Sequence, residues 1–158
     1  MVIPFILMLN SGCAFAAFLI LKKKRSVIHK RLERVLIGLG SSVMSLAISM
    51  NVQLWLHVLA FAIYLSVLFG VAIGVVFGLL DMRQLMMIGY QQGLIGGLMG
   101  AMLGAVVLNP SLCGLPAEYG NSIETHTAAF SFFSLFLSAA TVGLIYFINE
   151  SSEVNSEV

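Results

Sequence analysis

Charge is what this 158-residue sequence has least of. Only 9% of its residues are Asp, Glu, Lys or Arg, against roughly 25% in an ordinary soluble domain. The charges are also confined, because seven of the eight Lys and Arg residues lie between Lys22 and Arg34, and the eighth is Arg83. So few charges cannot cover the surface of a soluble domain. The composition therefore excludes that class and indicates a polytopic membrane protein.

Cysteine and catalytic motifs are scarce as well. The two cysteines, Cys13 and Cys113, form no Cys-x-x-Cys pair, and their expected positions at different depths argue against a mutual disulfide. The sequence contains no His-Glu-x-x-His helix, no Gly-x-Ser-x-Gly elbow and no phosphate-binding glycine loop with its lysine. We therefore predict a protein that is not an enzyme and that carries no cofactor.

Apolar stretches fill the sequence between its polar segments. About 20 residues cross ~30 Å of hydrocarbon as a helix, and a helix satisfies its own backbone polar groups in lipid. We predict one all-α domain, a transmembrane helix bundle of about five spans, at residues 2–21, 35–50, 54–80, 85–108 and 127–148. Asn51 and Gln53 supply the polar break between the second and third spans. The second span is short, and the alternative is four spans plus a re-entrant segment at 35–50.

The basic residues predict the orientation of the chain. Segment 22–34 carries seven basic residues and one Glu, and short loops of this kind stay on the cytoplasmic side. The N-terminus and the loop 109–126 are then expected outside, and the acidic tail 149–158 inside. The first span has no basic residue before it, which favours a permanent anchor over a cleaved signal peptide. The expected location is the plasma membrane, as in a bacterial inner membrane.

Segment 22–34, "KKKRSVIHKRLER", has two interpretations. Its apolar residues Val27, Ile28 and Leu32 fall near one helical face, which is typical of an interfacial helix that binds anionic lipid headgroups. The alternative is a topology signal alone. Nucleic-acid binding is not expected of so short a patch beside a membrane.

Glycine is concentrated on one face of the fourth span. At ~100° per residue, the six glycines of "GYQQGLIGGLMGAMLG" fall within a narrow arc, and the third span carries three more at four-residue intervals. Small residues let neighbouring helix backbones approach closely, so we predict that spans three and four form a tightly packed antiparallel hairpin. The alternative is an interface between copies of the chain or a pore. The predicted packing residues are Gly70, Gly74, Gly78, Gly89, Gly93, Gly96, Gly97, Gly100 and Gly104.

Two adjacent glutamines interrupt the same span. Gln92 flanks the glycines and is expected to hydrogen-bond to the third span, whereas Gln91 points to another neighbour or to a water-filled cavity. We interpret them as interhelical hydrogen-bonding groups, the alternative being the lining of a solute path. No span core contains Asp, Glu, Lys or Arg, which disfavours a proton-driven carrier.

Three residues expected on the outer side are the candidates for a metal site, namely His57, Cys113 and His126. Imidazole and thiolate bind soft metals, and the chain has nine methionines. Methionine is also common filler in apolar helices, so we expect no bound metal.

The function expected from these features is that of a non-enzymatic accessory, assembly or scaffold subunit. Its partners are expected to be the lipid bilayer and either a second copy of the chain or another membrane protein. The alternative is a small oligomeric channel or transport protein that handles a soft metal ion.

Overall fold

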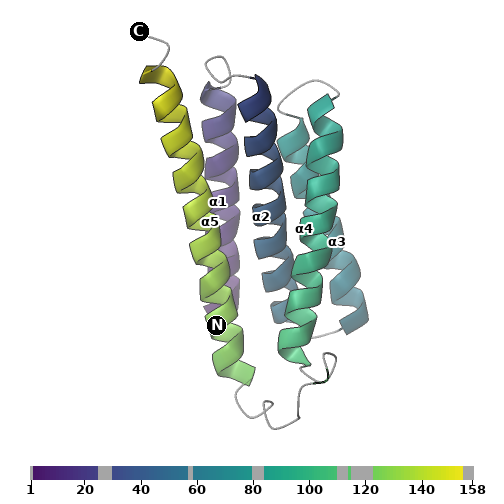
Figure 1. Ribbon diagram of the computed structural model, residues 1–158. Helices are drawn as coiled ribbons and strands as arrows, with labels where there is room; N and C mark the ends of the chain where they lie inside the picture. Colours follow the sequence, from purple (N-terminus) through teal and green to yellow (C-terminus); the bar gives the residue numbers. More distant parts are fainter. Residues whose placement is uncertain are drawn as a thin grey trace.

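The computed structural model describes residues 2–24, 30–56, 59–79, 84–109, 114 and 123–154, and these residues are almost entirely helical (Figure 1). Long apolar runs with no internal proline favour helix, and Pro4 lies in the first turn of its helix, where no intrahelical donor is required. The helices are α1 (Val2–Lys24), α2 (Lys30–Leu56), α3 (Leu59–Gly78), α4 (Gln84–Leu108) and α5 (Ile123–Val154).

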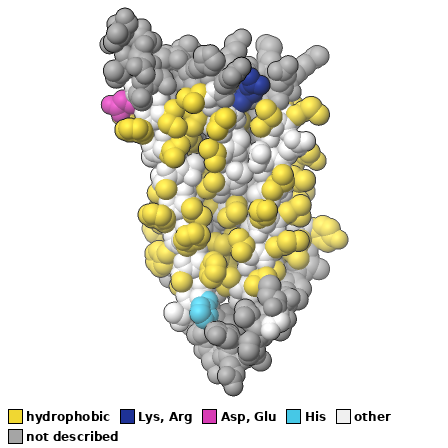
Figure 2. Space-filling view, in the orientation of Figure 1, with side chains coloured by type: hydrophobic (Ala, Val, Ile, Leu, Met, Phe, Trp, Pro, Cys, Tyr) yellow, Lys and Arg dark blue, Asp and Glu magenta, His cyan; other side chains and the backbone are white. Residues whose placement is uncertain are grey.

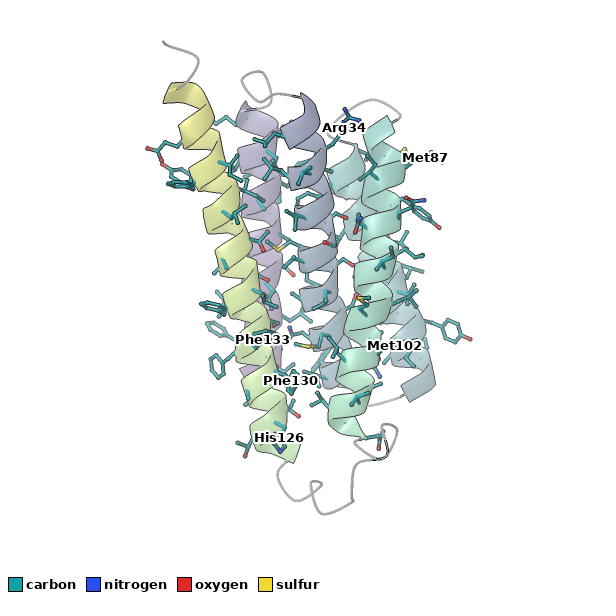
Figure 3. All side chains as sticks on the ribbon, in the orientation of Figure 1. Arg34, Met87, Met102, His126, Phe130 and Phe133 are labelled. Atoms are coloured by element: carbon teal, nitrogen blue, oxygen red, sulfur yellow. The ribbon has the colours of Figure 1, made fainter. Side chains whose placement is uncertain are left out.

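Each of these five helices is long and apolar enough to cross a membrane. The prediction of an all-helical fold with five apolar helices is therefore confirmed for the described residues. Hydrophobic side chains cover the visible face of the bundle between its ends (Figure 2). Arg34 lies near one end of the bundle and His126 at the other (Figure 3). These features are compatible with a multi-pass integral membrane protein.

The second helix, α2, is the centre of the bundle. In its apolar stretch 72% of the residues are buried, against 22% in those of α1 and α5. The helices α3 and α4 pack on one side of α2, and α1 and α5 pack on the other, where they also contact each other (Figure 1). The fold therefore consists of two three-helix groups that share α2, and the start of α1 and the end of α5 lie at opposite ends of the bundle.

The predicted break at Asn51 and Gln53 is wrong. The second helix continues through both residues to Leu56, and both side chains are completely buried inside the bundle. The Asn51 amide donates to the Ala47 carbonyl one turn earlier, at 2.8 Å. A polar side chain that bonds within the bundle does not end a helix. With 27 residues, α2 is long enough to cross the bilayer, so the re-entrant alternative at 35–50 does not describe this helix.

The basic segment and the acidic tail also differ from their predicted forms. Residues 22–24 belong to α1 and residues 30–34 to α2, so segment 22–34 is not a separate interfacial helix. Similarly, α5 begins at Ile123 and continues to Val154. Residues 123–126 of the predicted outer loop and residues 149–154 of the predicted tail therefore belong to this helix. Continued backbone hydrogen bonding extends these helices beyond their apolar stretches.

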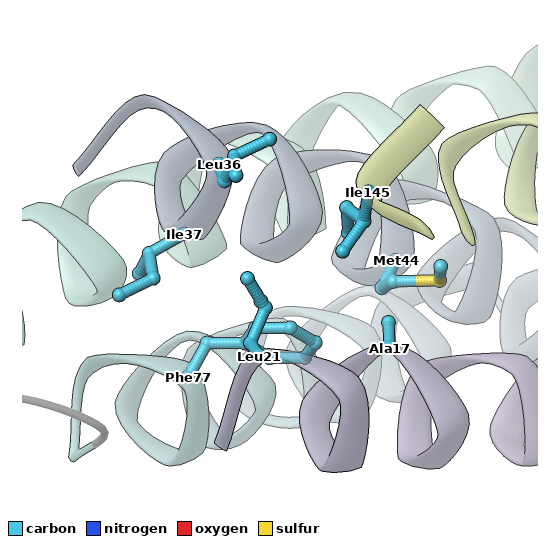
Figure 4. Packing of buried hydrophobic residues seen from close by; sticks show 7 residues of the cluster. All are labelled: Ala17, Leu21, Leu36, Ile37, Met44, Phe77 and Ile145. Atoms are coloured by element: carbon cyan, nitrogen blue, oxygen red, sulfur yellow. The ribbon is translucent and has the colours of Figure 1, made fainter. Parts of the chain in front are cut away.

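An apolar cluster joins the two groups of helices (Figure 4). Its buried side chains come from four helices, and α2 supplies three of them. Beside it, the rings of Phe18 on α1 and Phe77 on α3 meet edge to face, with centroids 6.1 Å apart, an arrangement that aromatic quadrupoles favour. The cluster comprises Ala17, Leu21, Leu36, Ile37, Met44, Phe77 and Ile145.

Candidate functional site

One row of glycines brings the backbones of α3 and α4 into contact. A Cβ atom added at Gly93 would lie 2.6 Å from both the Gly70 carbonyl oxygen and the Gly74 Cα. An added Cβ at Gly70 would lie 2.7 Å from the Gly97 Cα, and Gly74 and Gly89 meet each other's carbonyl oxygens in the same way. Any side chain at these positions would occupy space now filled by the neighbouring backbone.

A second row of glycines on α4 faces α2 instead of α3. A Cβ added at Gly104 would lie 2.7 Å from the Gln53 Cβ, while added Cβ atoms at Gly96 and Gly100 would meet the carbonyl oxygens of Ser42 and Leu46. The glycine arc of α4 is therefore divided between two neighbours. The expectation of a two-helix hairpin omitted α2, although the four-residue spacing from Gly96 to Gly104 could have indicated a second contact.

Serine hydroxyls on α2 form hydrogen bonds to glycines of the first row. Ser41 donates to the Gly89 carbonyl at 3.0 Å, and Ser45 donates to the Gly93 carbonyl at 2.6 Å. These carbonyl oxygens are accessible because glycine has no side chain to cover them. The three-helix group α2–α3–α4 is consequently held by close packing and by hydrogen bonds to backbone acceptors.

The α2–α3 contact has its own reciprocal pair of serines. Ser49 donates to the Ser66 carbonyl at 2.8 Å, and Ser66 donates to the Ser49 carbonyl at 3.2 Å. Both residues are fully buried. A hydroxyl that bonds a carbonyl on another helix satisfies its donor without water, which is the general requirement in an apolar interior.

A buried polar cluster joins α1, α2 and α5 on the other side of the bundle. The side-chain amides of Asn10 and Asn51 both donate to the Ser134 hydroxyl oxygen, at 3.1 Å and 2.7 Å. Ser134 in turn donates to the Ser131 carbonyl at 2.7 Å. All four residues are completely buried, so three helices meet at one hydroxyl group. Nothing in the local sequence pattern of α1 pairs Asn10 with α5, so this cluster was not predicted.

The polar cluster retains atoms that no protein group bonds. These are the amide oxygens of Asn10 and Asn51 and the hydroxyl of Ser131, and the buried hydroxyl of Ser138, further along α5, also lacks a partner. Leaving a buried polar atom unbonded costs about 1–3 kcal/mol, and buried water commonly supplies such bonds. The groups are neutral oxygen acceptors and hydroxyls, so the cluster can bind water or another small hydrogen-bonding molecule. The Gln53 side chain lies beside Gly104 on the α4 side of the bundle. It is fully buried, and neither its amide nitrogen nor its amide oxygen has a hydrogen-bond partner.

The two glutamines on α4 lie on different sides of the helix. Gln92 is partly buried, and its Cγ would lie 3.8 Å from a Cβ added at Gly38. It therefore faces α2, and not α3 as expected. Gln91 is exposed on the outer surface of the bundle, so it does not face the interior of the described helices.

The candidate metal ligands are only partly described. His57 and Cys113 lie outside the described residues, and His126 is exposed near the start of α5. Among the residues that the structure describes, no group of three or more His, Cys, Asp and Glu side chains could hold a metal. The methionines Met87, Met99 and Met102 are exposed along α4, with Met87 and Met102 toward opposite ends of the helix (Figure 3). They form apolar surface and do not converge on a site.

Comparison with known proteins adds no relative to this picture. No protein-family model matches the chain, no curated protein matches it, and no solved structure matches it.

Proposed function

We propose that this chain is a multi-pass plasma-membrane protein, of the bacterial inner-membrane type, that serves as a non-enzymatic accessory, assembly or scaffold subunit. The basic residues of segment 22–34 support an orientation with the N-terminus outside and the C-terminus inside. Anionic lipid headgroups and another membrane protein are its proposed partners.

The use of both glycine rows within one chain carries this proposal. Small-residue faces are the usual means by which membrane helices associate, and here α2 and α3 of the same chain already occupy those of α4. A closely packed interface between identical subunits would require another helix face of small residues. The group α2–α3–α4 is thus a self-contained core, which suits a subunit that presents its outer surface to a different protein.

The outer surface of α5 is the face best suited to a partner. Phe133 and Phe136 are 55% and 69% exposed, and Phe147 is 72% exposed. Large aromatic side chains provide extensive contact area to a neighbouring helix or to lipid. They lie on α5, which packs mainly with α1 and α2 and touches α4 only slightly, away from most of the glycine core.

A photo-crosslinking amino acid at Phe136 tests the accessory role in living cells. We expect a crosslinked product with one defined membrane protein, which mass spectrometry would identify, and no product from the same label at Tyr64 on the opposite outer surface. Tyr64 is a matched control because it is an aromatic residue that is 78% exposed on α3. Crosslinks only between copies of the chain at Phe136 would contradict the accessory role.

A small oligomeric channel or transport protein is the second candidate function. The unbonded buried atoms between α1, α2 and α5 favour it, because polar groups at membrane depth often line a solute path. Reconstitution in nanodiscs separates the two functions. A channel requires a stable oligomer and conductance in planar bilayers, whereas the accessory subunit is expected to be a monomer without conductance.

A further inference from the structure

An apolar groove runs along the bundle between α1 and α3. Its volume is about 370 Å³. The α1 wall extends from Leu7 to Phe18, the α3 wall extends from Phe69 to Phe77, and α2 forms the floor. Both walls pack on α2, and they meet each other where the rings of Phe18 and Phe77 are in contact. Ser11 is the one polar residue among those that line the groove.

The groove is long enough to hold much of one lipid chain. From Leu7 to Phe18 the α1 wall rises by about 16 Å at 1.5 Å per residue, and one leaflet contributes about 15 Å of the ~30 Å hydrocarbon core. A continuous apolar groove of this length suits a single flexible chain.

The groove leads to a basic end. Along α1 the residues Ser11, Phe15, Phe18 and Lys22 follow one another at intervals of four, three and four, which places them on one helical face. Lys22 and its neighbour Lys23 are both exposed. Lysine binds phosphate as a point charge, so a phosphate near Lys22 could belong to a molecule whose apolar part lies in the groove.

We propose that this groove binds an acyl chain of an anionic phospholipid whose phosphate contacts Lys22. The side-chain atoms that line an unfilled groove have no partners for dispersion contacts. The surrounding bilayer supplies acyl chains that can fill the groove. The charge at the basic end then selects the headgroup. The proposal rests on the membrane insertion proposed above, and it adds a specific lipid site to it.

Lipid retention measured by native mass spectrometry tests the site. The purified protein is offered phosphatidylglycerol or phosphatidylcholine with identical acyl chains, in a detergent of constant composition. We expect one phosphatidylglycerol to be retained per chain, with weaker retention of phosphatidylcholine. Lys22→Gln is expected to weaken phosphatidylglycerol binding by about fivefold, the usual contribution of one basic residue near an anionic lipid surface. It should weaken phosphatidylcholine binding less, because the choline ammonium of that headgroup offsets the charge of its phosphate.

Filling the groove is expected to remove the retention of both lipids. Ala72 is an exposed residue of the α3 wall, so Ala72→Phe adds bulk to the groove without entering the core. Ala139→Phe is the matched control, because Ala139 is an exposed residue of α5 and lies outside the groove. Ser11→Phe fills the groove from the opposite wall and replaces Ala72→Phe if that variant loses its helical content.

Three results would overturn the proposal, each in a different way. Equal lipid retention by Ala72→Phe and Ala139→Phe would show that the groove is not the site. An unchanged preference for phosphatidylglycerol in Lys22→Gln would remove the headgroup assignment. A dimer that Ala72→Phe abolishes would show that the groove binds a second copy of the chain. Purification of a folded, monodisperse chain without detergent would instead contradict membrane insertion itself.

Discussion

The substitution Gly93→Ala tests how closely α3 and α4 approach. The added Cβ would lie 2.6 Å from the Gly70 carbonyl oxygen and from the Gly74 Cα, whereas ordinary contacts begin at 3.4 Å. The two helices must therefore separate locally by about 0.8 Å, the difference between these distances. Both obstacles are backbone atoms, so no side-chain rotation relieves the clash.

The expected loss of stability follows from this displacement. Overpacking a well-packed interior costs about 1–3 kcal/mol, and weakening the neighbouring interhelical hydrogen bonds adds roughly 0.6 kcal/mol for each bond lost. We expect Gly93→Ala to lower the free energy of unfolding by about 2 kcal/mol relative to a control. The control is Gly143→Ala, because nothing lies within 4 Å of a Cβ added at Gly143. The stability change of Gly143→Ala therefore reports only the difference in helix propensity between glycine and alanine.

Unfolding by SDS in mixed micelles, followed by the fluorescence of Trp55, gives the two free energies. The chain has a single tryptophan, so the signal comes from one place at the end of α2. A Gly93→Ala variant as stable as Gly143→Ala would refute the close backbone contact. It would then follow that the glycines of α4 face lipid or another molecule.

Three further results are expected. Ser45→Ala removes a hydroxyl that is bonded to a carbonyl, and it is expected to lower the free energy of unfolding by up to about 1.7 kcal/mol. Ser138→Ala removes an unbonded hydroxyl and should lower it less in the same assay. Equal losses of stability would mean that a molecule such as water bonds Ser138. In a Cys113→Ser background, a cysteine at Asn121 should react with an impermeant thiol reagent in intact cells and one at Ser152 should not, and the reverse pattern would invert the proposed orientation. Elemental analysis of the purified protein should find no stoichiometric copper or zinc, and one metal ion per chain would contradict that expectation.

The number and apolar character of the helices could be predicted from sequence because both depend on local composition. A helix in lipid satisfies its own backbone, so length and hydropathy suffice to recognise it. The prediction failed at Asn51 and Gln53 because it depended on contacts that local composition does not show. Whether a polar residue ends a helix depends on its partners, and the bonding partners of Asn51 are Ala47 in its own helix and Ser134 in α5. The distant partner cannot be read from the neighbouring sequence.

The candidate sites show the same division between local and distant information. The glycines of α4 are a local pattern, but their allocation between α2 and α3 depends on how the helices are arranged in space. The polar cluster depends on Asn10 and Ser134, which are 124 residues apart. The groove depends on two helices that are separated in sequence by α2 and that leave a gap between them. Each of these features depends on how the helices are arranged in space. The periodicity of a single sequence does not predict that arrangement.

The contact between the first and last helices has a consequence for biosynthesis. Asn10 is made at the start of translation, and its partner Ser134 follows 124 residues later. At about 5–20 residues per second, the Asn10 amide waits roughly 6–25 s for that partner. The group α2–α3–α4 is complete by residue 108, before any of α5 exists. The bundle therefore closes last along α1 and α5, and a ribosome that stalls before residue 134 leaves an intermediate in which the amides of Asn10 and Asn51 both lack their shared partner Ser134.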